Sequence, residues 1–169
     1  MTVLAGAIGV LFSVAHGARA MSNEPTGFGP VPFGASAATV QKAFPTLQSK
    51  GTEQFLSLYE LRDQKVLGLK PCLLQLRFVD DQLYEIQFTC EPRARVPAAL
   101  QKAFGEPTET APTGTSWLGE KRTVGLNPAS GVFVFTDRAR GQIAHQKLLR
   151  YILSRPAQPA PSPAATPGP

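Results

Sequence analysis

Two cysteines enclose a stretch in which apolar and polar residues alternate, and the chain has no other cysteine. The stretch runs from Cys72 to Cys90 and reads CLLQLRFVDDQLYEIQFTC. Alternation with a period of two is typical of a β-strand that buries one face. The central pair Asp80-Asp81 is typical of a turn. The stretch therefore predicts an antiparallel hairpin with one apolar face.

The pairing of the two strands is restricted because their apolar residues must share one face. A three-residue loop from Asp80 to Gln82, with Gln82 left-handed, meets this condition and pairs Phe78 with Tyr84. It also places Cys72 opposite Cys90, where the Cβ atoms approach bonding distance. We expect a disulfide if the chain is exported, and two buried free thiols if it stays in the cytoplasm.

The N-terminal segment has the features of an export signal. Residues 1–20 contain an uncharged apolar run and end in Ala18-Arg19-Ala20, a small-residue cleavage pattern. No Lys or Arg precedes the apolar run. We predict a signal peptide over residues 1–20 and a periplasmic or secreted product. The alternative is a translation start at Met21 and a cytoplasmic product.

The other end is rich in proline and alanine. Residues 156–169 contain only Pro, Ala, Ser, Gln, Thr and Gly, so they have little to bury, and we expect a disordered tail. Residues 21–155 remain and suffice for a single domain with a core. The chain carries 17 Lys and Arg against 12 Asp and Glu, and its cations are scattered without interleaved aromatic residues. We therefore expect no nucleic acid partner, and a solvated surface or weak attraction to anionic lipid, peptidoglycan or an acidic protein.

A short internal repeat divides the domain. VQKAFPT at 40–46 recurs as LQKAFGEPT at 100–108, and both segments have the spacing of short amphipathic helices. Ser36 is a candidate N-cap of the first helix, and Gly105 ends the second. Alternating strands follow each helix. We predict an α+β fold of two repeat units, 34–91 and 95–137, each with a helix and about three antiparallel strands, followed by a C-terminal helix over 140–153.

The motifs resemble a family of envelope proteins. PFGASAATVQKAFP is similar to the helix entry of small bacterial envelope domains of the SmpA/OmlA type, the outer-membrane assembly lipoproteins. It also resembles the entry of the β-lactamase inhibitor protein, whose fold is a tandem of two such units. LQKAFGEPT followed by TSWL, and LRFVDDQLYEI, resemble further stretches of this class. The resemblance implies the tandem architecture; function does not follow from it.

Residues with catalytic or metal-binding potential are few. Outside the predicted signal the only histidine is His145, and the sequence has no zinc-ligand spacing, phosphate-binding loop or nucleophile elbow. We expect no cofactor, no metal and no enzymatic activity. Asp80 and Asp81 fit a turn better than a paired acid.

Three functions remain open. We favour a secreted, non-enzymatic binding or scaffold protein of the bacterial cell envelope, with no stable membrane anchor after signal cleavage. The alternatives are a proteinaceous enzyme inhibitor or immunity-type protein, and a hydrolase with an unrecognised site. Another envelope protein is the expected partner, and the sequence leaves the oligomeric state open. The candidate interaction residues are Trp117, which also suits a core position, Tyr84, Arg138 and Arg140.

Overall fold

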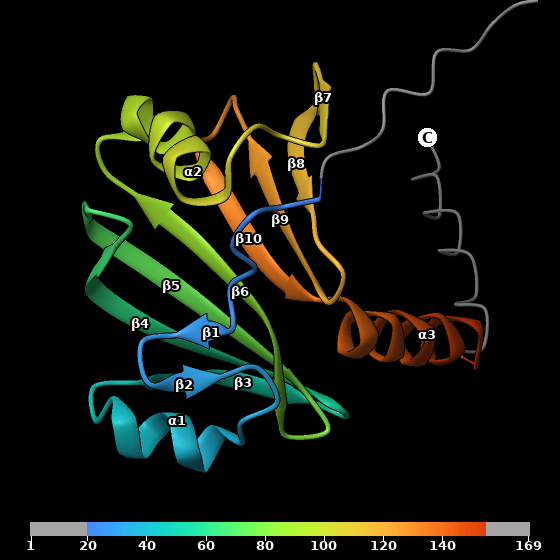
Figure 1. Ribbon diagram of the computed structural model, residues 1–169. Helices are drawn as coiled ribbons and strands as arrows, with labels where there is room; N and C mark the ends of the chain where they lie inside the picture. The colour runs from blue at the N-terminus through green and yellow to red at the C-terminus, as the bar shows by residue number, and fades with distance from the viewer. Residues whose placement is uncertain (1–19, 155–169) are drawn as a thin grey trace, which may run out of the picture.

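The structure is a computed structural model that describes residues 20–154, so residues 1–19 of the predicted signal and the predicted tail lie outside it. Within this range the chain forms an eight-stranded antiparallel sheet, a two-stranded ribbon, three α-helices and one 3₁₀ helix (Figure 1). The predicted α+β class is confirmed. None of the described helices has the length and apolar content needed to cross a bilayer.

The secondary-structure elements have the following order and bounds: β1 (Gly27–Phe28), β2 (Val31–Pro32), α1 (Ala37–Ala43), β3 (Gln48–Glu53), β4 (Leu56–Val66), β5 (Leu69–Val79), β6 (Gln82–Cys90), η1 (Arg93–Arg95), α2 (Val96–Phe104), β7 (Glu109–Ala111), β8 (Gly114–Leu118), β9 (Arg122–Asn127), β10 (Val132–Asp137) and α3 (Arg138–Ser154). Ser36 caps α1 by accepting a hydrogen bond from the Thr39 amide, as the sequence predicts.

The strand order of the large sheet is β3-β4-β5-β6-β10-β9-β8-β7. Four strands follow α1 and four follow α2, so the prediction of about three strands per unit is wrong. The missed strands are the two edges, β3 and β7, whose residues are all exposed. Because neither edge strand buries a face, neither carries the alternation that reveals a strand in sequence.

One face of the sheet is covered. The helices α1 and α2 and the ribbon β1–β2 pack on this face, where Val40 of α1 and Leu100 of α2 are fully buried. Beneath them, Phe88 of β6 stacks on Phe133 of β10 with ring centroids 4.7 Å apart. The core therefore lies between the sheet and these elements (Figure 1).

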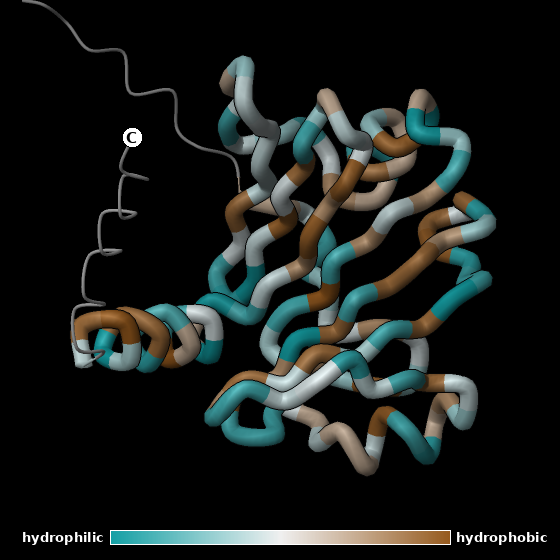
Figure 2. Tube along the Cα trace, turned by 180° about the vertical axis from the view of Figure 1, so that it is seen from behind, coloured by the Kyte–Doolittle hydropathy of each residue, from teal (hydrophilic) through white to brown (hydrophobic). Residues whose placement is uncertain are grey.

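The opposite face carries no helix across its centre among the described residues (Figure 2). Of the described helices only α3 lies beside it, starting at the end of β10 and packing against β5 and β6. We call this side of the large sheet the open face. Its strand residues are mostly of intermediate exposure, whereas the core-facing residues between them are buried.

The β5–β6 hairpin has the predicted register over most of its length. Cys72 pairs with Cys90, and the pairing continues without a shift to Arg77 opposite Glu85. The predicted loop is wrong: Asp80 and Asp81 form a two-residue turn with positive φ at both positions, and Phe78 pairs with Leu83 rather than Tyr84. A bulge in β6 accounts for the extra residue.

The bulge has a specific partner in the loop before α1. The Gly34 amide donates to the Leu83 carbonyl at 2.8 Å, and the Leu83 amide donates to the Ala35 carbonyl at 2.9 Å. Leu83 is fully buried in the core as a result. Tyr84 turns to the open face instead of the apolar face that its position in the alternation predicts.

The segment Arg62-Asp63-Gln64 contains an aspartate, a residue type common in turns, but the chain does not reverse there. β4 continues through these residues to Val66, with register shifts on both sides of Gln64, and the chain reverses at Leu67-Gly68. Asp63 has a positive φ, so the turn-type residues mark an irregularity inside a strand.

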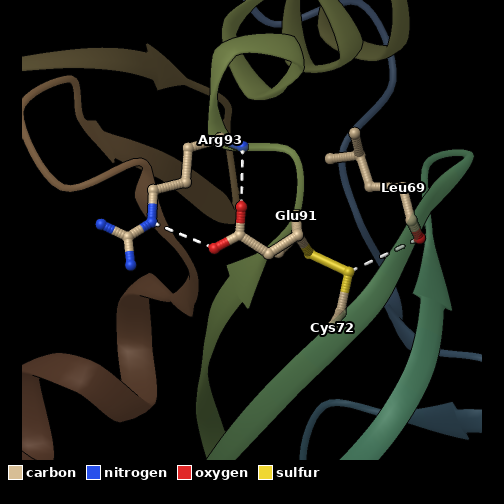
Figure 3. Close-up of a disulfide and its surroundings, with 5 residues drawn as sticks. Leu69, Cys72, Glu91 and Arg93 are labelled. Carbon is tan, nitrogen blue, oxygen red and sulfur yellow. Dashed lines mark hydrogen bonds and ion pairs between the residues drawn. A yellow bond between two sulfur atoms is a disulfide. The ribbon is translucent and has the colours of Figure 1, made fainter.

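The two cysteines are joined by a disulfide, with Cα atoms 4.1 Å apart, and both are buried (Figure 3). This spacing suits a non-hydrogen-bonded antiparallel pair. Just beyond the bond, the Glu91 carboxylate accepts hydrogen bonds from the amide and the Nε of Arg93, both at 3.3 Å. The disulfide therefore closes the open end of the hairpin where the chain leaves for α2.

Reduction of the disulfide should lower the free energy of unfolding by about 3 kcal/mol, because the bond closes a loop of 18 residues in sequence separation. Urea unfolding of protein expressed in the periplasm, before and after reduction, measures the difference. Alkylation followed by intact-mass measurement provides the control. Two thiols alkylated in unreduced protein would contradict the bond.

The C-terminal helix α3, Arg138–Ser154, is slightly longer at both ends than the predicted range 140–153. A buried carboxylate fixes its first turn. Asp137, only 1 % exposed, accepts a hydrogen bond from the Arg140 amide at 2.9 Å. Its Oδ2 also forms ion pairs with Arg140 at 2.8 Å and with Arg122 of β9 at 3.0 Å. This carboxylate therefore ties β10, β9 and α3 together.

The substitution Asp137→Asn should destabilise the fold by about 3 kcal/mol, because it leaves two guanidinium groups without their buried counter-charge. Asp80→Asn is a matched control, since it breaks the ion pair of α3 with Lys147 at a half-exposed aspartate and should cost less than about 1 kcal/mol. Chemical denaturation measures both. Equal losses would show that Asp137 has no special role.

Candidate functional site

The open face is organised in rows of side chains that cross the sheet. One row passes through all eight strands in register, and its members are Gln48, Glu60, Gln75, Gln87, Val134, Gly125, Ser116 and Glu109. Cross-strand neighbours on one face are close enough to interact. The Gln87 amide donates to Gln75 Oε1 at 3.1 Å, so these polar groups satisfy each other.

A second row lies beside the first. Its members are Leu58, Arg77, Glu85, Thr136, Thr123 and Leu118. Arg77 Nη1 forms an ion pair with Glu85 Oε1 at 2.6 Å. Both rows therefore combine paired polar groups with apolar residues, which are Val134 and Gly125 in the first row and Leu58 and Leu118 in the second. This mixed composition is compatible with contact with water and with a polar protein interface.

The first row contains one residue without a side chain, Gly125. A Cβ atom built on this glycine meets no atom within 4 Å, and its φ lies outside the left-handed region. Its cross-strand neighbours on either side are Val134 and Ser116. The surface above Gly125 is therefore open, and a side chain of a partner can fit there.

Glu60 is the most buried carboxylate of the first row, with 7 % of its surface exposed. Its Oε1 lies 2.5 Å from Arg62 Nη2 and 3.5 Å from Lys50 Nζ. Burial acts to raise the pKa of Glu60, but the hydrogen bond and charge of Arg62, with help from Lys50, outweigh it and hold the pKa below its ordinary value of 4.5. Glu60 is therefore an ionised structural group.

Substitution of Glu60 by Gln tests this assignment through the pH dependence of stability. A lowered folded-state pKa contributes stability that is present above the unfolded value of 4.5 and is lost as pH falls through the folded value. The wild type should therefore be more stable than Glu60→Gln near neutral pH, and the difference should shrink below pH 4.5. Denaturant unfolding across this range measures it, with the exposed Glu120→Gln as control. A difference that grows on acidification would contradict the assignment.

A groove borders the open face where α3 leaves the sheet. Its volume is about 690 Å³, and its lining includes Tyr84, Glu85, Thr136, Arg138 and His145. A second hollow of about 340 Å³ lies on the other side of Tyr84, near Lys50 and Arg77, and the two hollows share Leu56. Tyr84 therefore stands between two depressions on one side of the molecule.

The phenol of Tyr84 is neutral at physiological pH. Its burial raises its pKa above the ordinary 10.0, and the neighbouring Glu85 charge acts in the same direction while Arg77 opposes it. In this form its hydroxyl can donate as well as accept a hydrogen bond.

The four predicted interaction residues separate into different environments. Tyr84 and Arg138 line the same groove. Arg140 is engaged with Asp137 and with Gln82 at 2.9 Å. Trp117 occupies the core, only 2 % exposed, and its indole nitrogen donates to the Gly105 carbonyl at 2.8 Å. The tryptophan therefore joins the end of α2 to β8, and in this structure it is not on the surface.

The other residues considered from the sequence either form contacts within the fold or line the groove. Asp81 accepts a hydrogen bond from the Ala37 amide at the start of α1, and Asp80 pairs with Lys147 of α3. His145 lines the groove. Within residues 20–154 no three His, Cys, Asp or Glu side chains gather as a metal site would require.

Sequence reasoning identified Tyr84 but missed the rows of the open face. The signal was present, because Gln75, Arg77, Glu85 and Gln87 are the polar members of the alternation. Alternation alone indicates only that these side chains face away from the core. Their alignment with strands of the second half depends on the β6–β10 pairing, which no local pattern encodes.

No family model, curated protein or solved structure matches this chain.

Proposed function

We propose that the protein is a secreted or periplasmic, non-enzymatic binding module of the bacterial cell envelope that contacts a protein partner through its open face. The observation that carries the proposal is the row of paired polar and small side chains that crosses all eight strands. A continuous sheet is a rigid platform, so side chains on it are already positioned and lose little entropy when a partner binds.

Export is part of the proposal. A buried disulfide joins the only two cysteines, and such bonds persist in oxidising compartments. The predicted signal over residues 1–20 and the resemblance to SmpA/OmlA-type and β-lactamase-inhibitor-type domains agree with an envelope location.

We also propose that the two halves are copies of one helix-plus-four-strand unit. The sheet order supports this, since each half keeps its strands in sequence order and the two halves meet at their last strands. Val40 and Leu100 occupy equivalent repeat positions, and both are fully buried. Superposition of α1–β6 on α2–β10 in an experimental structure tests the idea, because copies should align with both residues equivalent.

The substitution Gly125→Arg tests the binding function directly. The new side chain would project over the middle of the first row, and because its Cβ enters open space the fold should keep its stability. With the exported full chain as bait in an envelope extract, wild type should retain one stoichiometric partner, and Gly125→Arg should retain about tenfold less, since one obstructing side chain costs at least 1.4 kcal/mol.

Gln41→Arg is the matched control, because it adds the same charge at an exposed position of α1 on the covered side of the sheet. It should bind the partner as wild type does. Recovery of an envelope assembly component supports the scaffold role, and recovery of a hydrolase that loses activity when bound supports the inhibitor alternative. No partner, or equal loss in both variants, would overturn binding through the open face.

A further inference from the structure

Exposed apolar side chains are concentrated on α3. Six large apolar residues of the described chain are exposed, and five of them belong to this helix: Ile143, Leu148, Leu149, Ile152 and Leu153. Leu153 has 83 % of its surface in contact with solvent. The apolar side chains of α3 therefore pack only slightly into the domain, since Ala144 is the only buried residue of the helix. Apolar surface gathered in one place commonly marks a contact site.

The exposed residues of the last two turns do not all face the domain. Leu148 and Ile152 line a hollow of about 220 Å³ beside Phe55, so they lie at the edge of the packed side. Leu149 and Leu153 are four residues apart and thus share a side of the helix. Counted at 3.6 residues per turn, that side lies away from Ala144. The helix therefore presents a continuous apolar arc at its free end.

All the charges on α3 are positive. The helix contains Arg138, Arg140, Lys147 and Arg150 and neither Asp nor Glu, and the next residue in the sequence is Arg155. Arg140 and Lys147 are paired with Asp137 and Asp80 of the domain. Arg150 is exposed, lies between the leucines in sequence, and has no acidic partner among the described residues. The apolar arc thus carries unneutralised positive charge beside it.

The positive charges of α3 indicate which kind of partner can cover its apolar arc. Two copies of α3 packed against each other would bring cations together without a compensating acid on either helix. An anionic phospholipid surface instead accepts the leucines below its headgroups and the cations among its phosphates. The way the helix is attached also permits this. One side of its last turns borders the β3–β4 turn at Phe55, and the other side, with Leu149 and Leu153, is exposed (Figures 1 and 2).

We propose that α3 is an interfacial helix that docks the protein reversibly on an anionic phospholipid membrane. Leu149, Leu153 and the adjacent Ile152 insert at the boundary between headgroups and acyl chains. Arg150 contacts lipid phosphate. The Asp137 ion pairs keep the first turn fixed to the sheet, so the domain is carried at the surface. The open face then lies beside the membrane, joined to α3 through the groove.

Vesicle flotation of the exported full chain tests the proposal, with its N-terminus determined by intact mass so that the predicted signal does not contribute. Wild type should float with vesicles of phosphatidylcholine and phosphatidylglycerol, and less with phosphatidylcholine alone. The double substitution Leu149→Gln and Leu153→Gln should reduce binding about tenfold or more, because two leucines no longer leave water. Arg150→Glu should reduce binding to anionic vesicles only.

Leu67→Gln is the matched control, since it removes an exposed leucine at the β4–β5 turn, away from α3, and should bind as wild type does. Circular dichroism must show that each variant keeps its fold. Equal flotation of wild type and the Leu149/Leu153 variant would overturn the proposal, as would equal binding to neutral and anionic vesicles. A solution dimer that the same double substitution dissociates, without vesicle binding, would replace the membrane by a second copy.

Discussion

The pairing of β6 with β10 is the constraint on which the rest of the structure depends. It is the only strand pairing between the first four and the last four strands of the large sheet. Phe88 of β6 packs against both Phe133 and Phe135 of β10, with ring centroids 4.7 and 4.6 Å apart. These aromatic contacts fix the register between segments that lie far apart in sequence. The same register carries the rows of the open face from one half into the other, so core packing and surface pattern are set together.

The disulfide and the bulge fix the two ends of β6 in different ways. At one end Cys90 is bonded to Cys72, which prevents the hairpin from slipping. At the other end the bulge sends Leu83 into the core, where it pairs with the loop before α1. Tyr84 then faces the opposite side, between the two hollows of the open face. A local departure from regular pairing thus supplies the core with one side chain and the candidate site with another.

Features that depend on local pattern were predictable, and features that depend on distant partners were not. Cys72 was correctly predicted opposite Cys90, because the apolar residues of both strands share one face and the bulge takes up the residue that was assigned to the loop. The bulge was not, because it depends on hydrogen bonds between β6 and Gly34, far away in sequence. The edge strands β3 and β7 were not predicted for another reason: a fully exposed strand has no buried face, so its sequence does not alternate. The buried position of Trp117 depends on the Gly105 carbonyl, which accepts its indole N–H and belongs to another element.

The C-terminal helix shows why periodicity alone does not establish burial. Ala144, Leu148 and Ile152 recur every four residues, which predicts a face packed on the domain, yet Leu148 is 39 % and Ile152 is 55 % exposed. The helix is held by Ala144, which packs with Val79 and Tyr84. Polar contacts through Asp137 and the Asp80–Lys147 pair hold it as well. Leu149 and Leu153, on the side of the helix away from Ala144, expose apolar surface that is unfavourable in water. Their presence beside unpaired positive charge is therefore better explained by an apolar, anionic surface outside the chain than by the stability of the fold.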